Sequence, residues 1–320
     1  MKVLVTGSSG YLGRHAVRGS LDRGFEVVGL DVKPSGIAHP HFREVIGDIT
    51  EPAAVHAAAE GCGAVLHLAA ALAQFERDEG RMRDVNVGGT ANALAAALAR
   101  GAGGFVFVSS VEVYGVDVPV PCPEEAPLRP LVQYGRDKVE CEAMCAEYLG
   151  RGLDVAVLRP PTINGPGQNE PFLVSQMEAI AKGKATLMPG GGKTRLQMVY
   201  AGDVVDAMFL CLGNPAARGL VANVASDGVP TLKELALALY EHAGTKARFI
   251  NVPAGLARAA VRALARFGLS PIEPQHLEIA LRDYVFDNSR AGSVLGWRPT
   301  RNDIESAIEA YDWHLGRKGP

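Results

Sequence analysis

Residues 6–13 read Thr-Gly-Ser-Ser-Gly-Tyr-Leu-Gly, and they follow the short apolar run KVLVT at Lys2–Thr6. This order predicts a buried strand, a glycine turn and then a helix. Gly7 allows the tight turn, Gly10 lets the backbone approach a pyrophosphate, and Gly13 lets the helix pack closely on the strand. The start of the helix offers unpaired N–H groups to phosphates. The stretch therefore predicts a dinucleotide-binding turn.

Two acidic residues follow later apolar runs. Asp31 ends the run EVVGLD, 18 residues after Gly13. A carboxylate at this position can accept both hydroxyls of an adenosine ribose and would repel a 2′-phosphate, so it favours NAD over NADP. Lys33 softens this preference, and the alternative is that Asp31 is only a turn residue. Asp48 ends the third predicted strand, where it is placed to reach the adenine amino group.

Short apolar runs alternate with helical patterns through the first half of the chain. Near-continuous apolar strands between helices are typical of a parallel sheet covered on both faces. Such α/β sheets are doubly wound and bind ligands at the carboxyl ends of their strands. The predicted strands are Lys2–Thr6, Glu26–Asp31, Glu44–Gly47, Ala64–Ala69, Gly104–Ser109 and Asp154–Arg159. The predicted helices are Tyr11–Arg23, Arg81–Arg100 and Tyr134–Leu149.

The pattern changes after Pro160, where proline and glycine become frequent. We expect the second half to form a smaller lobe over the carboxyl edge of the sheet. Its predicted helices are Phe172–Lys182, Asp203–Leu212, Thr231–Ala243, Ala254–Phe267 and Asn302–Leu315. The expected domain limits are 1–165 for the dinucleotide-binding domain, with 196–225 returning to it, and 166–195 with 226–320 mainly for the substrate domain.

Composition excludes several classes of protein. The chain has 320 residues, a net charge of −3 and a pI of about 6.3, which excludes a strongly basic nucleic-acid-binding surface as its main feature. No run of 18 apolar residues occurs, so we expect no membrane span. The N-terminal apolar run is too short for a signal peptide, and we expect a cytoplasmic protein. Five scattered cysteines predict buried free thiols and no metal site.

The segment Ala254–Phe267 is amphipathic and basic. It places Arg258, Arg262 and Arg266 at every fourth position. Such a helix could contact a membrane surface or an acidic partner, although a solvated helix face is the simpler interpretation.

Tyr134 and Lys138 form a Y-x-x-x-K pair, which a helix places on one face. A free tyrosine has a pKa near 10, and a nearby lysine together with an oxidised nicotinamide ring would favour the phenolate. Tyr134 would then act as the general base for a substrate hydroxyl, or as the acid in reverse. Ser109 and Ser110 end the fifth predicted strand, where one of the two hydroxyls could bond the substrate oxygen.

Taken with these motifs, the chain resembles the extended short-chain dehydrogenase/reductase superfamily, in its NAD-dependent epimerase/dehydratase branch. The resemblance covers nearly the whole chain. The stretches that carry it are TGSSGYLG at 6–13, GDIT at 47–50, HLAA at 67–70, NVGGT at 86–90, SSVEVYG at 109–115, YGRDK at 134–138, LRPPTINGPGQ at 158–168, QMVYAGDVVDA at 197–207, NVASDG at 223–228 and DNSRAGSVLGWRP at 287–299.

The resemblance implies a Rossmann domain that binds NAD, a smaller substrate domain and a homodimer formed by the helices near 81–100 and 134–150. It assigns Ser110, Tyr134 and Lys138 as catalytic, and it places Glu112 where some relatives keep an acid/base glutamate. The cofactor contacts that it implies are Gly7, Ser9, Gly10, Tyr11, Leu12, Gly13, Asp31, Asp48, Ile49, Leu68, Ala69, Ala70, Asn86, Val108, Ser109, Tyr134, Lys138, Pro161 and Ile163.

The resemblance weakens at the substrate. Ser110, Tyr134, Thr162 and Arg195 are the expected substrate contacts. Thr162 stands where sugar-nucleotide enzymes often keep a diphosphate-binding asparagine. Their arginine position falls on Leu196, with Arg195 next to it, and their later arginine has no clear counterpart, although Arg282 is nearby.

Three functions therefore stay open. The first, which the sequence favours, is a nucleoside-diphosphate-sugar epimerase similar to UDP-glucose 4-epimerase. The second is an NAD-dependent dehydrogenase or reductase of a non-nucleotide alcohol or ketone, similar to 3β-hydroxysteroid dehydrogenases or flavonol reductases. The third is an NAD-binding redox sensor without catalysis, which the intact Ser110, Tyr134 and Lys138 disfavour.

Overall fold

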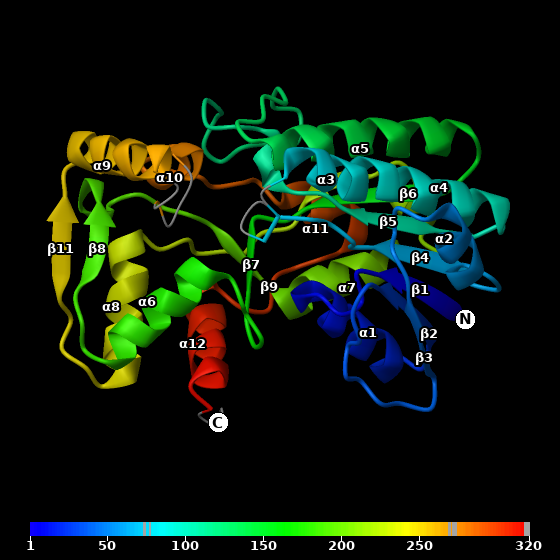
Figure 1. Cartoon of the computed structure of the whole chain (residues 1–320), viewed down its shortest axis with the longest axis horizontal. Helices are drawn as coiled ribbons and strands as arrows, with labels where there is room; N and C mark the ends of the chain where they lie inside the picture. Colours follow the sequence, from blue (N-terminus) through cyan, green and yellow to red (C-terminus); the bar gives the residue numbers. More distant parts are fainter. Residues whose placement is uncertain (73–74, 77, 268–269, 271–273, 317–320) are drawn as a thin grey trace.

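A computed structural model describes residues 1–72, 75–76, 78–267, 270 and 274–316. A parallel sheet of seven strands forms the larger lobe, in the order β10-β6-β5-β4-β1-β2-β3 (Figure 1). Every neighbouring pair is parallel, which confirms the doubly wound α/β sheet. The strands are β1 (Lys2–Thr6), β2 (Glu26–Asp31), β3 (Phe42–Ile46), β4 (Ala64–His67), β5 (Phe105–Val108), β6 (Val155–Arg159) and β10 (Val221–Asn223).

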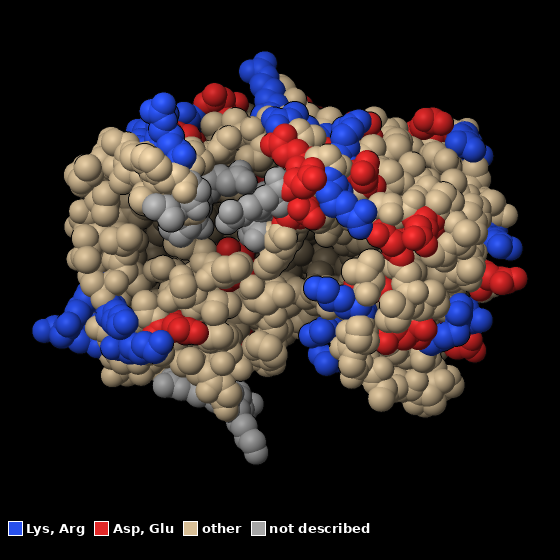
Figure 2. Space-filling model, viewed as in Figure 1, with Lys and Arg blue, Asp and Glu red and all other residues tan. Residues whose placement is uncertain are grey.

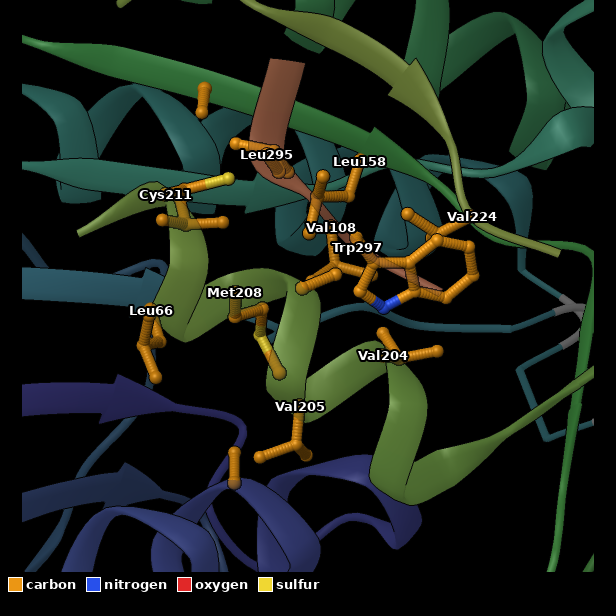
Figure 3. Close-up of a cluster of buried hydrophobic side chains, with 14 of the residues drawn as sticks. Leu66, Val108, Leu158, Val204, Val205, Met208, Cys211, Val224, Leu295 and Trp297 are labelled. Atoms are coloured by element: carbon orange, nitrogen blue, oxygen red, sulfur yellow. The ribbon is translucent and has the colours of Figure 1, made fainter. Parts of the chain in front are cut away.

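Helices cover both faces of this sheet, because its central strands are apolar on both sides. One face packs against α1 (Tyr11–Asp22), α7 (Ala201–Cys211) and α11 (Ser289–Leu295). Trp297, 2% exposed, fills the space between α7 and the sheet (Figure 3). The other face packs against α2 (Pro52–Ala58), α4 (Gly89–Ala99) and α5 (Gln133–Gly150).

The smaller lobe has its own core, which includes Met177, Ile180, Tyr240 and Tyr311. Its helices are α6 (Pro171–Ala181), α8 (Leu232–Ala243), α9 (Ala254–Arg266), α10 (Pro274–Ala280) and α12 (Asp303–His314) (Figure 1). Two small parallel sheets pair β8 (Thr186–Pro189) with β11 (Phe249–Val252), and β7 (Thr162–Asn164) with β9 (Met198–Tyr200). Short 3-10 turns span Val111–Val113, Gly190–Gly192 and Pro215–Ala217.

The structure corrects two predicted elements. The single helix expected at Arg81–Arg100 is α3 (Glu79–Arg83), a π-helical turn at Asp84–Gly88 and then α4. The strand expected at Ala64–Ala69 ends at His67, so the residues after it form a loop at the sheet edge. In the part of the chain that the structure describes, no helix combines the length and apolar character that a bilayer-spanning segment needs.

Candidate functional site

The glycine turn joins β1 to α1 in a conformation that excludes side chains. Gly7 has φ 70°, in the left-handed region, and its N–H donates to the Leu30 carbonyl at 2.8 Å. A Cβ on Gly13 would lie 1.9 Å from the Gly7 carbonyl oxygen. Gly10 is the N-cap of α1, so the first N–H groups of the helix open toward the turn. This geometry fits the close backbone approach that a pyrophosphate requires.

Tyr11, the first residue of α1, points a buried hydroxyl toward the second half of the chain. This hydroxyl has no hydrogen-bond partner among the described residues. Burial, followed by the nearby Tyr200, raises the pKa of Tyr11, so its hydroxyl stays a neutral donor. A Cβ on Gly165 would lie 3.4 Å from the Tyr11 oxygen. An unsatisfied buried donor beside the glycine turn is consistent with a polar ligand there.

Asp31 lies at the end of β2, next to the turn. Its carboxylate accepts the backbone N–H of Ser9 at 3.0 Å and that of Lys33 at 3.1 Å. The Ser9 hydroxyl donates to the Lys33 carbonyl at 2.5 Å. Asp31 therefore shapes the rim of the turn, and each carboxylate oxygen keeps a second lone pair for a ligand hydroxyl.

Asp48 follows β3 and is held as a carboxylate. One oxygen accepts the N–H of Thr50 at 2.9 Å and its hydroxyl at 2.8 Å, and the other lies 2.8 Å from the Arg81 guanidinium. The Thr50 N–H, the Thr50 hydroxyl and Arg81 together lower the pKa of Asp48 despite some burial. An adenine amino group bound at Asp48 would donate to the same carboxylate that Arg81 contacts.

The loop after β4 is fixed from two sides. The Thr6 hydroxyl oxygen accepts the N–H groups of Leu68 at 3.2 Å and Ala69 at 3.3 Å. Asn86, on the π-helical turn and 2% exposed, exchanges two hydrogen bonds with the Ala71 backbone and donates to Asp137 at 3.2 Å. π-Helical turns are frequent at functional sites, and this one aims Asn86 at the loop.

The proposed catalytic residues lie where β5 ends and α5 begins. Lys138, 3% exposed, donates to the Val108 carbonyl at 2.8 Å, and its Nζ lies 5.5 Å from the centre of the Tyr134 ring. Ser110 caps the 3-10 turn at Val111–Val113 by accepting the N–H of Glu112 at 3.1 Å. The fold therefore brings the predicted serine, tyrosine, lysine and glutamate to one edge of the sheet.

In the protein without a cofactor, burial determines the pKa values of Tyr134 and Lys138. Burial, and then the Glu112 carboxylate, raise the pKa of Tyr134, whereas burial lowers the pKa of Lys138. The phenol is neutral at pH 7 in the protein alone. The expected lowering relied on two cations, and only Lys138 belongs to the chain.

Ser109 points away from Ser110. Its hydroxyl donates to Glu142 at 2.5 Å, and Glu142 forms a buried two-bond ion pair with Arg159 at 2.5 and 2.9 Å. Arg159 also donates to the Tyr114 hydroxyl at 2.8 Å. The network joins β5, β6 and α5 beneath the catalytic residues, and no sequence motif indicates the pairing of Glu142 with Arg159.

Two of the expected substrate contacts, Thr162 and Arg195, lie on or near the small parallel sheet of β7 and β9. Thr162 is exposed at the start of β7, between buried Pro161 and half-buried Ile163. Arg195 donates to Asp283 through its side chain at 2.9 and 2.5 Å, and its N–H adds a bond at 2.9 Å. Figure 2 shows the surface hollowed where the two lobes meet.

His276 on α10 reaches this region from the smaller lobe. Its Nε2 lies 3.9 Å from the Glu112 carboxylate. No motif in the sequence indicates this residue, because α10 lies far from the catalytic stretch along the chain. The described residues hold no cluster of His, Cys, Asp and Glu suited to a metal ion.

Comparisons with known proteins follow this geometry. A model of the NAD dependent epimerase/dehydratase family matches residues 3–225. The chain is 32% identical to a Sinorhizobium fredii protein of uncharacterized function, over 98% of this chain and 79% of that one. It is 31% identical to a UDP-glucose 4-epimerase of Mycolicibacterium smegmatis, over 93% and 94% of the two chains. It is 28% identical to a 3β-hydroxysteroid dehydrogenase/Δ5→4-isomerase of Mycobacterium tuberculosis, over 98% and 90%.

Solved structures agree on the fold. UDP-glucose 4-epimerase of Thermotoga maritima, solved with UDP-glucose, has a TM-score of 0.83 at 24% identity, over 99% of both chains. A short-chain dehydrogenase/reductase superfamily protein of Agrobacterium tumefaciens, solved with NAD, has a TM-score of 0.78 at 24% identity, over 99% and 98%. Since the family model also spans more than half of the sequence, the chain belongs to the NAD-dependent epimerase/dehydratase family of the extended short-chain dehydrogenase/reductase superfamily.

Proposed function

We propose that this protein is an NAD-dependent oxidoreductase that acts at a secondary alcohol or ketone carbon. The glycine turn would hold the pyrophosphate, Asp31 the adenosine ribose, and the loop at Leu68–Ala70 the dinucleotide beside it. When bound, NAD would supply the acceptor or donor for hydride. A 2′-phosphate would be repelled by Asp31, which supports NAD rather than NADP.

The chain's own residues would handle the proton. Tyr134 would take the proton of the substrate hydroxyl, and Ser110 would donate a hydrogen bond to the same oxygen. Lys138, held against the Val108 carbonyl, would stabilise the phenolate with its positive charge. Because burial raises the pKa of Tyr134, we expect proton removal only when further positive charge is bound nearby.

The substrate that we favour is neutral. A diphosphate requires cationic or bidentate donors. Both arginines near the predicted positions are already paired with carboxylates, Arg195 with Asp283 and Arg282 with Asp117. Because these two arginines are already paired, we propose that the substrate is a non-nucleotide alcohol or ketone. The enzyme would then be a dehydrogenase or reductase.

A nucleoside-diphosphate-sugar epimerase remains the second candidate. The similarity to the M. smegmatis UDP-glucose 4-epimerase over nearly the full length of both chains favours it. In that case a keto intermediate would rotate in the site and be reduced on its other face, and a diphosphate would have to displace Asp283 from Arg195.

Two measurements separate these candidates. Steady NADH formation with added NAD and an apolar secondary alcohol supports the dehydrogenase. A 340 nm signal that appears only with UDP-sugars, together with NAD that stays bound through gel filtration, supports the epimerase and contradicts our preference.

Replacing Tyr134 tests the chemistry shared by both candidates. Tyr134→Phe should lower kcat by about 10²–10⁴-fold, because it removes the proton-transfer group. NAD affinity, measured by calorimetry, should stay within a few-fold of wild type. Tyr148→Phe, on the same helix, is the matched control and should keep full activity. An active Tyr134→Phe variant would contradict the mechanism.

We also propose that the protein works in the cytoplasm as a homodimer joined through α4 and α5. Analytical ultracentrifugation tests the dimer.

A further inference from the structure

Helix α9 turns an apolar stripe toward solvent. Leu256, Leu264 and Phe267 are 62%, 41% and 78% exposed. Ala260 and Ala263 are exposed between them. The spacing of 256, 260, 263, 264 and 267 places all five on one side of the helix, since residues three, four and seven apart share a face. Ala257, 6% exposed, lies at the edge of this stripe, three residues before Ala260 and seven before Leu264.

Positive charge borders this stripe. From His242 to Phe267 the chain carries Lys246, Arg248, Arg258, Arg262 and Arg266 but no Asp or Glu, although the whole protein has a net charge of −3. Arg262 and Arg266 are exposed and form no ion pair with any described residue. Cations are therefore concentrated in one segment of an acidic protein.

The strand that leads into α9, β11, and the residue just before it also expose apolar and basic side chains. Ile250 on β11 and Leu187 on β8 are direct partners across the small sheet, and they are 52% and 61% exposed. Arg248 lies two residues before Ile250, and both are exposed, as the alternation along a strand predicts. β8, β11 and α9 lie together at one end of the smaller lobe (Figure 1). Their exposed side chains include both apolar residues and cations.

We propose that α9, with its apolar stripe of Leu256, Ala260, Ala263, Leu264 and Phe267, docks the protein onto an anionic lipid surface. A helix with an apolar face and bordering arginines lies in the plane of the membrane interface, with its apolar side chains between the headgroups. The arginines then face the lipid phosphates, which attract cations near the surface.

A second copy of the chain fits this surface poorly. Two α9 helices packed face to face would bring rows of arginines together without an acidic residue on either helix to compensate. The charge of the segment therefore favours an anionic surface over self-association.

Docking would be communicated to the catalytic region through two contacts. Arg258 joins α9 to α10 by bonds to Glu278 at 2.9 and 3.1 Å. On α10, His276 lies 3.9 Å from Glu112, the middle residue of the 3-10 turn that Ser110 caps. The surface that would contact lipid is thus one helix away from the mouth of the candidate site.

Vesicle co-sedimentation of the full chain tests the proposal. Wild type should bind vesicles of phosphatidylcholine and phosphatidylglycerol at least about tenfold more tightly than vesicles of phosphatidylcholine alone, and about 0.5 M salt should weaken that binding. Arg262→Gln with Arg266→Gln should reduce binding by about fivefold per arginine. Leu264→Gln with Phe267→Gln should reduce it by about tenfold or more.

Matched controls remove similar groups elsewhere. Arg18→Gln with Arg100→Gln takes two exposed arginines from the larger lobe, and Leu210→Gln with Leu237→Gln takes two exposed leucines from other helices. Both double variants should bind vesicles as wild type does. The proposal is overturned if wild type ignores anionic vesicles, if the α9 variants bind them equally well, or if those variants change only the oligomeric state in sedimentation equilibrium.

Discussion

Ser109 and Ser110 are neighbours in the chain but have different environments. Ser109 is bonded to Glu142 inside the buried Arg159 network. Ser110 accepts an N–H from Glu112 and has no described acceptor for its own hydroxyl hydrogen. That hydrogen is available to a substrate oxygen, so the two side chains should respond differently to the same deletion.

We predict that Ser110→Ala lowers kcat by about 10²-fold or more, because it removes the hydrogen-bond donor expected to bind the substrate oxygen. Its cost in stability should stay within about 1 kcal/mol, the loss of the cap on the Glu112 N–H. Ser109→Ala should instead cost about 1–3 kcal/mol of stability, because it leaves part of a buried carboxylate unpaired. Steady-state kinetics and urea unfolding of both variants check this contrast. Equal kinetic effects would contradict it.

At the residue scale, candidate site residues that belong to a local motif can be predicted from the sequence. Contacts between residues that lie far apart in the chain cannot. The glycines, Asp31, Tyr134 and Lys138 stand at fixed spacings that local chemistry explains. The partner of Arg195 is Asp283, 88 residues later, and no spacing rule connects them. The raised pKa of Tyr134 depends on burial, which the sequence does not report.

The turn between β1 and α1 depends on close packing of backbone against backbone. A Cβ on Gly13 would overlap the Gly7 carbonyl, and the neighbour cannot yield because it is main chain. A Cβ added to Gly150, in the last turn of α5, would meet nothing within 4 Å. The structure therefore leaves no room for a side chain at Gly13, whereas it can accommodate an alanine at Gly150.

Gly13→Ala should abolish measurable NAD binding and lower the melting temperature, because α1 must move away from the turn. Gly150→Ala should keep NAD affinity and gain up to about 1 kcal/mol from helix propensity. Calorimetric titration with NAD and thermal unfolding of both variants test this pair. Wild-type affinity in Gly13→Ala would show that the turn is not the binding site.

At the element scale, long periodic segments are predictable from the sequence and short ones are not. The first six strands and the helices α1 and α5 agree with their predicted ranges within about two residues. The seventh strand, β10, has only three residues, too few for a period. The π-helical turn at Asp84–Gly88 looks like ordinary helix in sequence, because its extra residue per turn leaves no compositional signal.

For the whole molecule, Asp303 links stability to pH. Its side chain is fully buried at the start of α12, and one of its oxygens has no partner among the described residues. Burial raises the pKa of Asp303 from 3.8 to about 6. The folded state therefore holds this proton more tightly than the unfolded state, and the stability that Asp303 contributes is lost as pH rises from about 4 to 6.

We expect Asp303→Asn to lack this loss. The difference in unfolding free energy between variant and wild type should grow in favour of the variant by about 2 kcal/mol from about pH 4 to pH 7. Any constant penalty from the new amide cancels in this comparison. Urea titrations at several pH values measure the difference, and a flat profile would contradict the prediction.

The position of Trp297 has a consequence for how the protein is made. Its indole packs between α7 and the sheet and donates to the Asp203 carbonyl at 2.9 Å (Figure 3). The larger lobe thus draws its covering residues from the start, the middle and nearly the end of the 320-residue chain. During synthesis, α1 and α7 can cover that face of the sheet only in part until α11 and Trp297 leave the ribosome. A shortened product ending before residue 297 would therefore leave part of the face exposed and be prone to aggregation.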